Sequence, residues 1–233
     1  MSFDFNLVFS SLPLIASGIG ITLKLLIIST LFGLALAVLI LLMRISGRWY
    51  LVWPAKAYIY FLRGTPILVQ IFIIYHGLPQ FGFIRDSILW PLLREPFGCC
   101  VLALSLNTSA YVSEILRGGV LGVDKGVNEA AMALGLTRTQ RFVYIISPIA
   151  VRLALPAYSN EFISMMKATA LASTVTLLDI TGVARTIVSK TFAPFEIFIS
   201  AALIYLVMAW IFQMGFGKLE SYVGRYTKRD TAP

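Results

Sequence analysis

The chain has 233 residues, of which 58% are hydrophobic and 13% are charged. A soluble domain usually carries about 25% charged residues, so this composition excludes an ordinary soluble domain and indicates a membrane protein. The net charge is +8, but the basic residues form short clusters between long uncharged runs. This pattern disfavours a nucleic-acid binder and favours a protein that is oriented in a membrane.

Long apolar runs predict the membrane-spanning helices, because a helix of roughly 20 residues crosses a hydrocarbon core about 30 Å thick. Four segments qualify directly: residues 22–43, 98–116, 154–178 and 195–216. We expect a fifth crossing over residues 66–84. The predicted fold class is therefore an all-α integral membrane protein with five transmembrane helices in a single domain.

The apolar run "YFLRGTPILVQIFIIYHG" is interrupted by polar and helix-breaking residues. Thr65 and Pro66 predict a helix start, with Thr65 as the N-cap and Pro66 in the first helical position. Residues 50–62 would then form an aromatic helix that lies along the membrane interface. The alternative is one helix over residues 53–77 that is kinked at Pro66. We favour the first interpretation, because it leaves Arg63 near the lipid headgroups.

The distribution of Lys and Arg predicts the orientation of the five helices. If the N-terminus is outside, most basic residues lie in cytoplasmic segments, and the outer segments hold Arg85, Arg94, Arg185 and Lys190. The positive-inside rule therefore predicts an outer N-terminus and a cytoplasmic C-terminus. The segment before Lys24 lacks the basic region of a cleaved secretory signal, so we expect its apolar run to be retained.

Residues 117–152 form the longest predicted cytoplasmic connection. Asn128 is expected to cap a helix that begins at Glu129, an acid that is favourable at the positive end of the helix dipole. Gly135 is expected to end or bend this helix. A narrow apolar edge would be formed by Ala130, Ala131 and Leu134. The spacing alone leaves two interpretations open: a surface helix that rests on its own protein, or a docking element for a soluble partner.

The same loop contains a motif that resembles the "EAA…G…I-x-L-P" loop of the membrane subunits of bacterial ABC importers. The matching residues are Glu129, Ala130, Ala131, Gly135, Ile145 and Pro148. Ser147 stands where the family pattern has Leu. The resemblance implies that this loop forms a coupling helix in a groove of an ATP-binding subunit, with coupling residues Glu129, Ala130, Ala131, Gly135 and Pro148.

Three further segments are similar to polar amino-acid importer permeases: "FLRGTPILVQIFIIYHGL", "LNTSAYVSEILRGG" and "ALPAYSNEFISMMKATALAS". The histidine/lysine/arginine/ornithine and opine permeases are the most similar type. The resemblance implies a type I ABC importer permease fold in the bacterial inner membrane. It also implies an ATP-binding subunit dimer, a second permease subunit that is similar or identical to this one, and a periplasmic amino-acid-binding protein as partners, in a lipid bilayer and without nucleic acid.

Two stripes of polar residues are expected inside the predicted spans. The first is Asn107, Tyr111 and Glu114, and the second is Asn160, Ser164 and Lys167, with Glu161 beside it. Residues at these spacings share one helical face. Hydrogen bonds between helices explain the amides and hydroxyls, and Glu114 is expected to pair with Arg117 three residues later.

The charges of Glu161 and Lys167 require more than packing, because a charged group in lipid needs a partner or a water-filled path. An amino acid is a zwitterion, so a carboxylate and an ammonium group could hold its two ends. The resemblance places Glu161 where related importers contact substrate. The predicted substrate-binding residues are Glu161, Lys167, Asn107 and Gln70, the last two because their motifs match.

The chain contains no G-x-x-x-x-G-K-[ST] loop, so ATP and Mg²⁺ are expected on the partner ATPase and not on this chain. We expect no catalytic residue, metal site or cofactor here. The predicted function is ATP-driven import of amino acids, with basic amino acids or opines as the substrate class. The alternative is an ion-coupled secondary amino-acid transporter in which Glu161 titrates.

Overall fold

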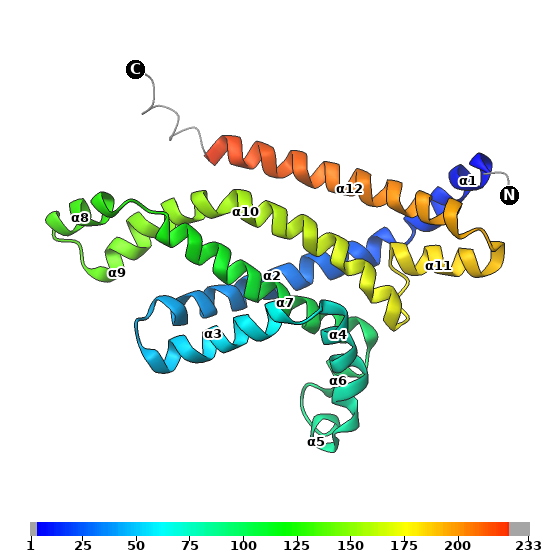
Figure 1. Ribbon diagram of the computed structural model, residues 1–233, viewed down its shortest axis with the longest axis horizontal. Helices are drawn as coiled ribbons and strands as arrows, with labels where there is room; N and C mark the ends of the chain where they lie inside the picture. Colours follow the sequence, from blue (N-terminus) through cyan, green and yellow to red (C-terminus); the bar gives the residue numbers. More distant parts are fainter. Residues whose placement is uncertain (1–3, 224–233) are drawn as a thin grey trace.

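The computed structural model describes residues 4–223, and no β-strand occurs in that part of the chain. The chain folds into long helices joined by short ones (Figure 1). The α-helices are α1 (Phe5–Ala16), α2 (Ile19–Ile45), α3 (Trp49–Gly64), α4 (Ile67–Phe72), α5 (Gly82–Arg85), α6 (Trp90–Leu93), α7 (Pro96–Leu121), α8 (Lys125–Ala133), α9 (Arg138–Gln140), α10 (Ser147–Ala168), α11 (Ile180–Thr191) and α12 (Pro194–Val223). Two π-helices, η1 (Ile73–Gly77) and η3 (Arg141–Ile146), and two 3₁₀-helices, η2 (Leu78–Gln80) and η4 (Thr169–Val175), continue several of them.

Four continuous helical segments are long and apolar enough to cross a membrane: Ile19–Ile45, Pro96–Leu121, Arg138–Val175 and Pro194–Val223. The predicted runs at 22–43, 98–116 and 195–216 lie inside three of them. The run at 154–178 extends past Val175, where the helix ends. The all-helical membrane fold is therefore confirmed, with four spans or with five if the bent pair described next is counted.

The fifth predicted crossing is a pair of helices and not one. Trp49–Gly64 and Ile67–Gln80 are bent by 104° at the intervening residues, and α3 runs back beside α2 before the chain turns away (Figure 1). Ala55, Ile59 and Leu62 are the buried residues of α3, and their spacing gives it a face that packs in a cluster with residues of α2 and α7. α3 therefore packs on the bundle through one face, and its expected position along the membrane interface stays a prediction. The alternative of a single helix kinked at Pro66 was wrong, because residues 65 and 66 separate two helices.

The predicted cap of α4 was also wrong. Pro66 itself is the N-cap residue of α4 and makes no side-chain capping bond. The Thr65 hydroxyl instead donates to the carbonyl oxygen of Phe61 at 2.9 Å. Thr65 therefore contacts the end of α3 and not the start of the next helix.

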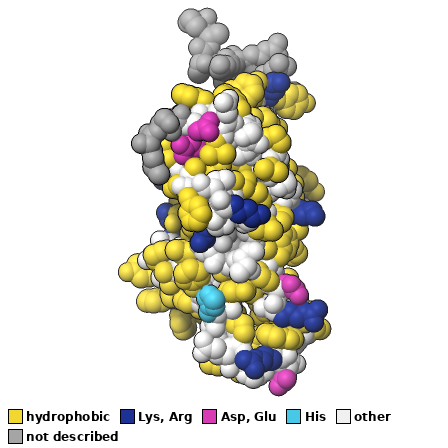
Figure 2. Space-filling model, turned by 90° about the vertical axis from the view of Figure 1, so that its right-hand side faces the viewer, with side chains coloured by type: hydrophobic (Ala, Val, Ile, Leu, Met, Phe, Trp, Pro, Cys, Tyr) yellow, Lys and Arg dark blue, Asp and Glu magenta, His cyan; other side chains and the backbone are white. Residues whose placement is uncertain are grey.

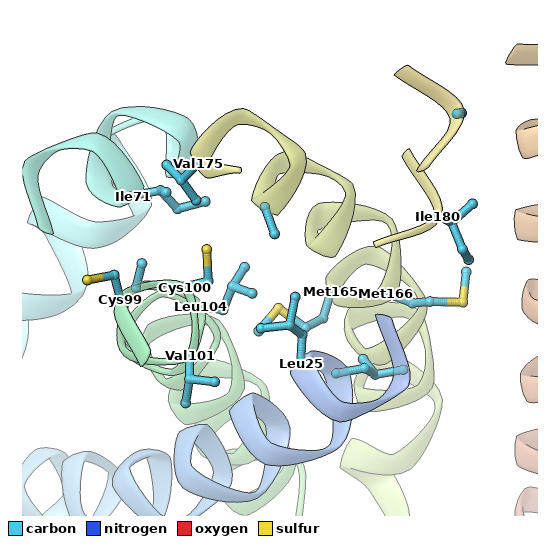
Figure 3. Packing of buried hydrophobic residues seen from close by; sticks show 14 of the residues in the cluster. Leu25, Ile71, Cys99, Cys100, Val101, Leu104, Met165, Met166, Val175 and Ile180 are labelled. Carbon is cyan, nitrogen blue, oxygen red and sulfur yellow. The ribbon is translucent and has the colours of Figure 1, made fainter. Parts of the chain in front are cut away.

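The hydrophobic core lies where α2, α7 and α10 meet. Leu25, Leu104 and Met165 come from these three helices and gather between them (Figure 3). α7 and α10 approach closely at Gly119, where an added Cβ would lie 2.4 Å from the carbonyl oxygen of Ala150. Small residues at such contacts let helix backbones approach in membrane proteins.

The two ends of the bundle carry different elements. α1 and α11 lie at one end, α8 and α9 lie at the other, and α12 runs from the first toward the second (Figure 1). The surface at the first end is mostly hydrophobic, with separated charged groups (Figure 2). Large apolar side chains on α2 and α12 are also exposed, such as Phe32 at 65% and Trp210 at 60%. Lipid chains would cover such a surface.

Candidate functional site

The break between α3 and α4 is stabilised by the side chain of Gln70. In a continuous helix the carbonyl of Leu62 would accept from the N–H four residues later, but Pro66 has no N–H. The Gln70 amide takes this place and donates to the Leu62 carbonyl at 2.8 Å. It also donates to the hydroxyl of Thr65 at 2.8 Å. Gln70 is buried, so these bonds satisfy backbone groups that lipid could not.

Asn107 of α7 completes the same network. Its amide nitrogen donates to Gln70 Oε1 at 3.0 Å and to the Leu62 carbonyl at 3.3 Å. The structure thus brings together two predicted substrate-binding residues, Gln70 and Asn107. Their hydrogen bonds go to each other, to the backbone and to the Thr65 hydroxyl, which gives them a structural role. Their contact with substrate stays a prediction.

A pocket of about 560 Å³ opens between α3 and α7, next to this break. The Arg63 guanidinium lies 5.0 Å from the ring centre of Tyr111, a cation–π contact. Three residues after Tyr111 on α7, the Glu114 carboxylate forms salt bridges with Arg117 at 2.7 Å and with Arg44 at 3.0 Å. The predicted pairing of Glu114 with Arg117 is confirmed, and Arg44 is a second partner that the sequence analysis missed.

Glu161 of α10 points to α7. Its carboxylate accepts a 3.2 Å hydrogen bond from the Thr108 hydroxyl, and its side chain is half-buried. The positive charge of Arg63 acts electrostatically on this carboxylate. Glu161 of α10 therefore interacts electrostatically with Arg63, which lies in the last turn of α3.

The second predicted stripe forms an uncovered polar face of α10. Asn160, Ser164 and Lys167 are all exposed. The Ser164 hydroxyl donates back to the carbonyl of Asn160 at 2.9 Å, and Lys167 forms no ion pair with any residue in the described part of the chain. Glu161 and Lys167 thus lie on different sides of the helix, and no direct bond joins them.

The segment with the loop motif folds into α8, which begins four residues before the predicted start. Asp124, and not Asn128, is its N-cap, accepting from the N–H of Gly126 at 2.6 Å. Glu129 is therefore in the middle of the helix, where the dipole has little effect. Asn128 instead accepts a 3.0 Å bond from Arg141 Nη1, which joins α8 to η3.

Gly135 ends α8, as predicted. It has a φ of +76°, a left-handed conformation that glycine adopts without strain. The N–H of Leu136 bonds to the carbonyl of Ala131 and the N–H of Gly135 to that of Met132, the pair of bonds that defines a Schellman motif.

The remaining motif residues differ in exposure. Ala131 is buried, whereas Glu129, Ala130 and Leu134 are exposed, so the role of the narrow apolar edge stays a prediction. Pro148 is exposed in the first turn of α10. α8 therefore packs on its own protein through Ala131 and presents Glu129 and Ala130 outward.

Residues 29–221 match the model of a protein family described as the binding-protein-dependent transport system inner membrane component. This chain belongs to that family. It is accordingly a multi-pass inner-membrane protein, and its resemblance to ABC importer permeases is confirmed by its relatives.

Three permeases of this family are similar to the chain over most of its length. The octopine transport system permease protein OccM of Rhizobium meliloti is 48% identical, covering 94% of this chain and 90% of its own. The nopaline permease protein NocM of Agrobacterium fabrum is 44% identical, covering 89% and 87%. The histidine/lysine/arginine/ornithine permease protein HisM of Escherichia coli K12 is 40% identical, covering 88% and 86%.

Solved structures of the permease family share the fold. The crystal structure of an amino acid ABC transporter with histidines superposes with a TM-score of 0.84 at 40% identity, over 95% of this chain and 100% of the other. An inward-facing MetNI methionine ABC transporter gives a TM-score of 0.70 at 15% identity, over 91% and 97%. The second likeness shows the fold alone. The expected type I permease fold is confirmed.

Proposed function

We propose that this chain is the membrane-spanning subunit of an ATP-driven importer for basic amino acids or opines, with an outer N-terminus and a cytoplasmic C-terminus. The proposal is supported by the names of its relatives, which transport octopine, nopaline or the basic amino acids. Opines and basic amino acids share a carboxylate and a cationic nitrogen group, so one polar path would serve both.

The observation that carries the substrate proposal is the half-buried carboxylate of Glu161. It has one hydrogen bond, from Thr108, and a carboxylate has room for several more. A cationic substrate group bound there would form a charge-assisted hydrogen bond. Arg63, or Lys167 on the exposed face, would bind the substrate carboxylate. Gln70 and Asn107 would support the site indirectly, because their hydrogen bonds hold the break between α3 and α4 and so position Arg63.

A second permease subunit would cover the polar face of α10. In the most apolar 18-residue stretch of α7, 61% of the residues are buried. In the corresponding stretch of the Arg138–Val175 segment, which contains α10, only 17% are buried. α12 is also little buried, at 22%, but most of its exposed residues are apolar, such as Leu206 and Trp210. Lipid would cover α12, whereas Asn160, Ser164 and Lys167 require a protein partner or water. The substrate path would then run between the two subunits.

α8 would couple this path to an ATP-binding subunit dimer on the cytoplasmic side. Its exposed residues Glu129 and Ala130 would contact the ATPase, while Asn128 transmits movement to η3 and α10 through Arg141. ATP and Mg²⁺ would be bound by the ATPase. A periplasmic binding protein would deliver substrate at the opposite end, near α11. Alternating access would follow from the movement of α10 and α7 relative to the partner subunit.

Transport by the complete complex in liposomes tests this proposal. Radiolabelled arginine should enter only with ATP, the ATPase and the binding protein present, and entry should continue when the proton gradient is collapsed. Competition with histidine, glutamine and octopine would define the substrate class. Uptake by this chain without an ATPase, driven by a proton gradient, would favour the secondary transporter and would refute the proposal.

A further inference from the structure

A pocket of about 580 Å³ lies where the ends of α2 and α7 meet the segment that carries α8, α9 and η3. It is separate from the pocket beside Arg63. Its lining combines the arginines Arg48, Arg138 and Arg141 with an apolar wall that includes Leu42, Ile45 and Phe142. No Asp or Glu is among the described residues that line it. The pocket is therefore both cationic and apolar.

The guanidinium groups of this pocket have few acceptors in the described part of the chain. Arg141 Nη1 donates to Asn128 at 3.0 Å, but Arg141 Nε is buried and has no hydrogen-bond partner among the described residues. Arg48 and Arg138 form no ion pair with that part of the chain. A buried donor without an acceptor is costly, and each such case calls for an explanation. A bound anion would supply the missing acceptor.

The position of the pocket indicates which anion. Leu42 and Ile45 belong to the last turn of the α2 span, so the apolar wall lies at the edge of the hydrocarbon. Trp49 and Tyr50 follow Arg48 directly and are 76% and 51% exposed. Exposed Trp and Tyr at the ends of membrane helices lie at the level of the lipid headgroups. The arginines are therefore at headgroup depth.

We propose that this pocket binds an anionic phospholipid, with its phosphodiester on the arginines and the start of an acyl chain on Leu42, Ile45 and Phe142. Guanidinium groups match phosphate oxygens in geometry and charge, and basic pockets between membrane helices bind anionic headgroups. A soluble phosphate would use the arginines but not the apolar wall. Because the pocket joins α2 and α7 to the segment with α8, the lipid would hold that segment against the bundle.

Native mass spectrometry of the complete, detergent-purified complex tests this proposal with phosphatidylglycerol as the probe and phosphatidylcholine as the neutral comparison. Phosphatidylglycerol should be retained in preference to phosphatidylcholine. Arg48→Gln and Arg138→Gln should each weaken its binding about fivefold. Arg94→Gln is the matched control, because Arg94 is exposed and outside the pocket, and it should leave binding unchanged.

Three outcomes would overturn the proposal. The first is equal phosphatidylglycerol binding by the wild type and the Arg48→Gln/Arg138→Gln double variant. The second is displacement of the lipid by inorganic phosphate at equal concentration, which indicates a soluble-anion site. The third is dissociation of the ATPase in these variants with lipid binding intact, which indicates a protein-docking surface. Arg141 is left unchanged so that its bond to Asn128 is kept, and thermal melting of each variant establishes that it is folded.

Discussion

The side-chain amide of Gln70 donates a hydrogen bond to the carbonyl oxygen of Leu62, across the break between α3 and α4. This bond replaces the one that Pro66 cannot make. Because both residues are buried, an unpaired carbonyl here would be costly, and the broken span depends on the amide. Residues 63–66, which interrupt the apolar run, and Gln70 therefore form one structural unit.

We expect Gln70→Leu to destabilise the complex by about 1–3 kcal/mol, because it leaves the Leu62 carbonyl with the longer bond from Asn107 alone. Gln80→Leu is the matched control: Gln80 also donates to a backbone carbonyl, that of His76, but is exposed. Thermal unfolding in detergent would measure both. Equal melting temperatures for the two variants would contradict this role of Gln70.

The proposed substrate contact predicts a difference between two residues of α10. Glu161→Gln should reduce uptake of a basic amino acid by about tenfold or more, because it removes the charge of a charge-assisted bond. Ser164→Ala should have a small effect, because its hydroxyl bonds to its own helix. Initial uptake rates in liposomes would measure both. Equal and mild losses would leave Glu161 with a packing role.

The proposed docking of α8 predicts that Glu129→Lys abolishes ATP-driven uptake while membrane insertion is retained. Glu129 is exposed and in the middle of the helix, so the charge reversal should act on the ATPase contact and not on the fold. Glu95→Lys reverses another exposed acid, far along the chain, and should preserve uptake. Co-purification of the ATPase with each variant provides the measurement. Unchanged transport by Glu129→Lys would argue against docking at this face.

Two neighbouring glycines provide a test of the α7–α10 contact. Gly119→Ala should destabilise the protein by about 1–3 kcal/mol, because the new Cβ would meet the Ala150 carbonyl at 2.4 Å. Nothing lies within 4 Å of a Cβ at Gly118, so Gly118→Ala should stabilise α7 by about 0.5–1 kcal/mol. Denaturation of the two variants should thus show opposite shifts. Shifts of the same sign would disprove the close approach.

The long helices could be predicted from the sequence because hydrophobicity over about 20 residues is a local property. The broken span could not. Its geometry depends on the contact of Leu62 with Gln70 and Asn107, which joins separate elements. The short helices α1 and α11 have 12 residues each, which is below the length of a span, so the search for long apolar runs missed them.

The candidate site was predicted in part. The helical spacing placed Asn107, Tyr111 and Glu114 on one face of the helix, and the structure gives each of them a contact with another helix. Arg44, the partner of Glu114, and Arg63, the partner of Tyr111, are distant from α7 in sequence. Only the packing of α2 and α3 against α7 brings them into contact. Asp124 took the capping role expected of Asn128, since both are good caps and position alone decides between them.

The uncovered face of α10 has a consequence for the life of the protein in the cell. A single copy inserted in a bilayer would leave the ammonium of Lys167 without a protein partner, and a lysine held in hydrocarbon costs about 3 kcal/mol at mid-membrane. In the assembly proposed above, a copy of this subunit that has not met its partner, whether a similar or an identical chain, would therefore expose this face and be less stable in the bilayer than the assembled subunit.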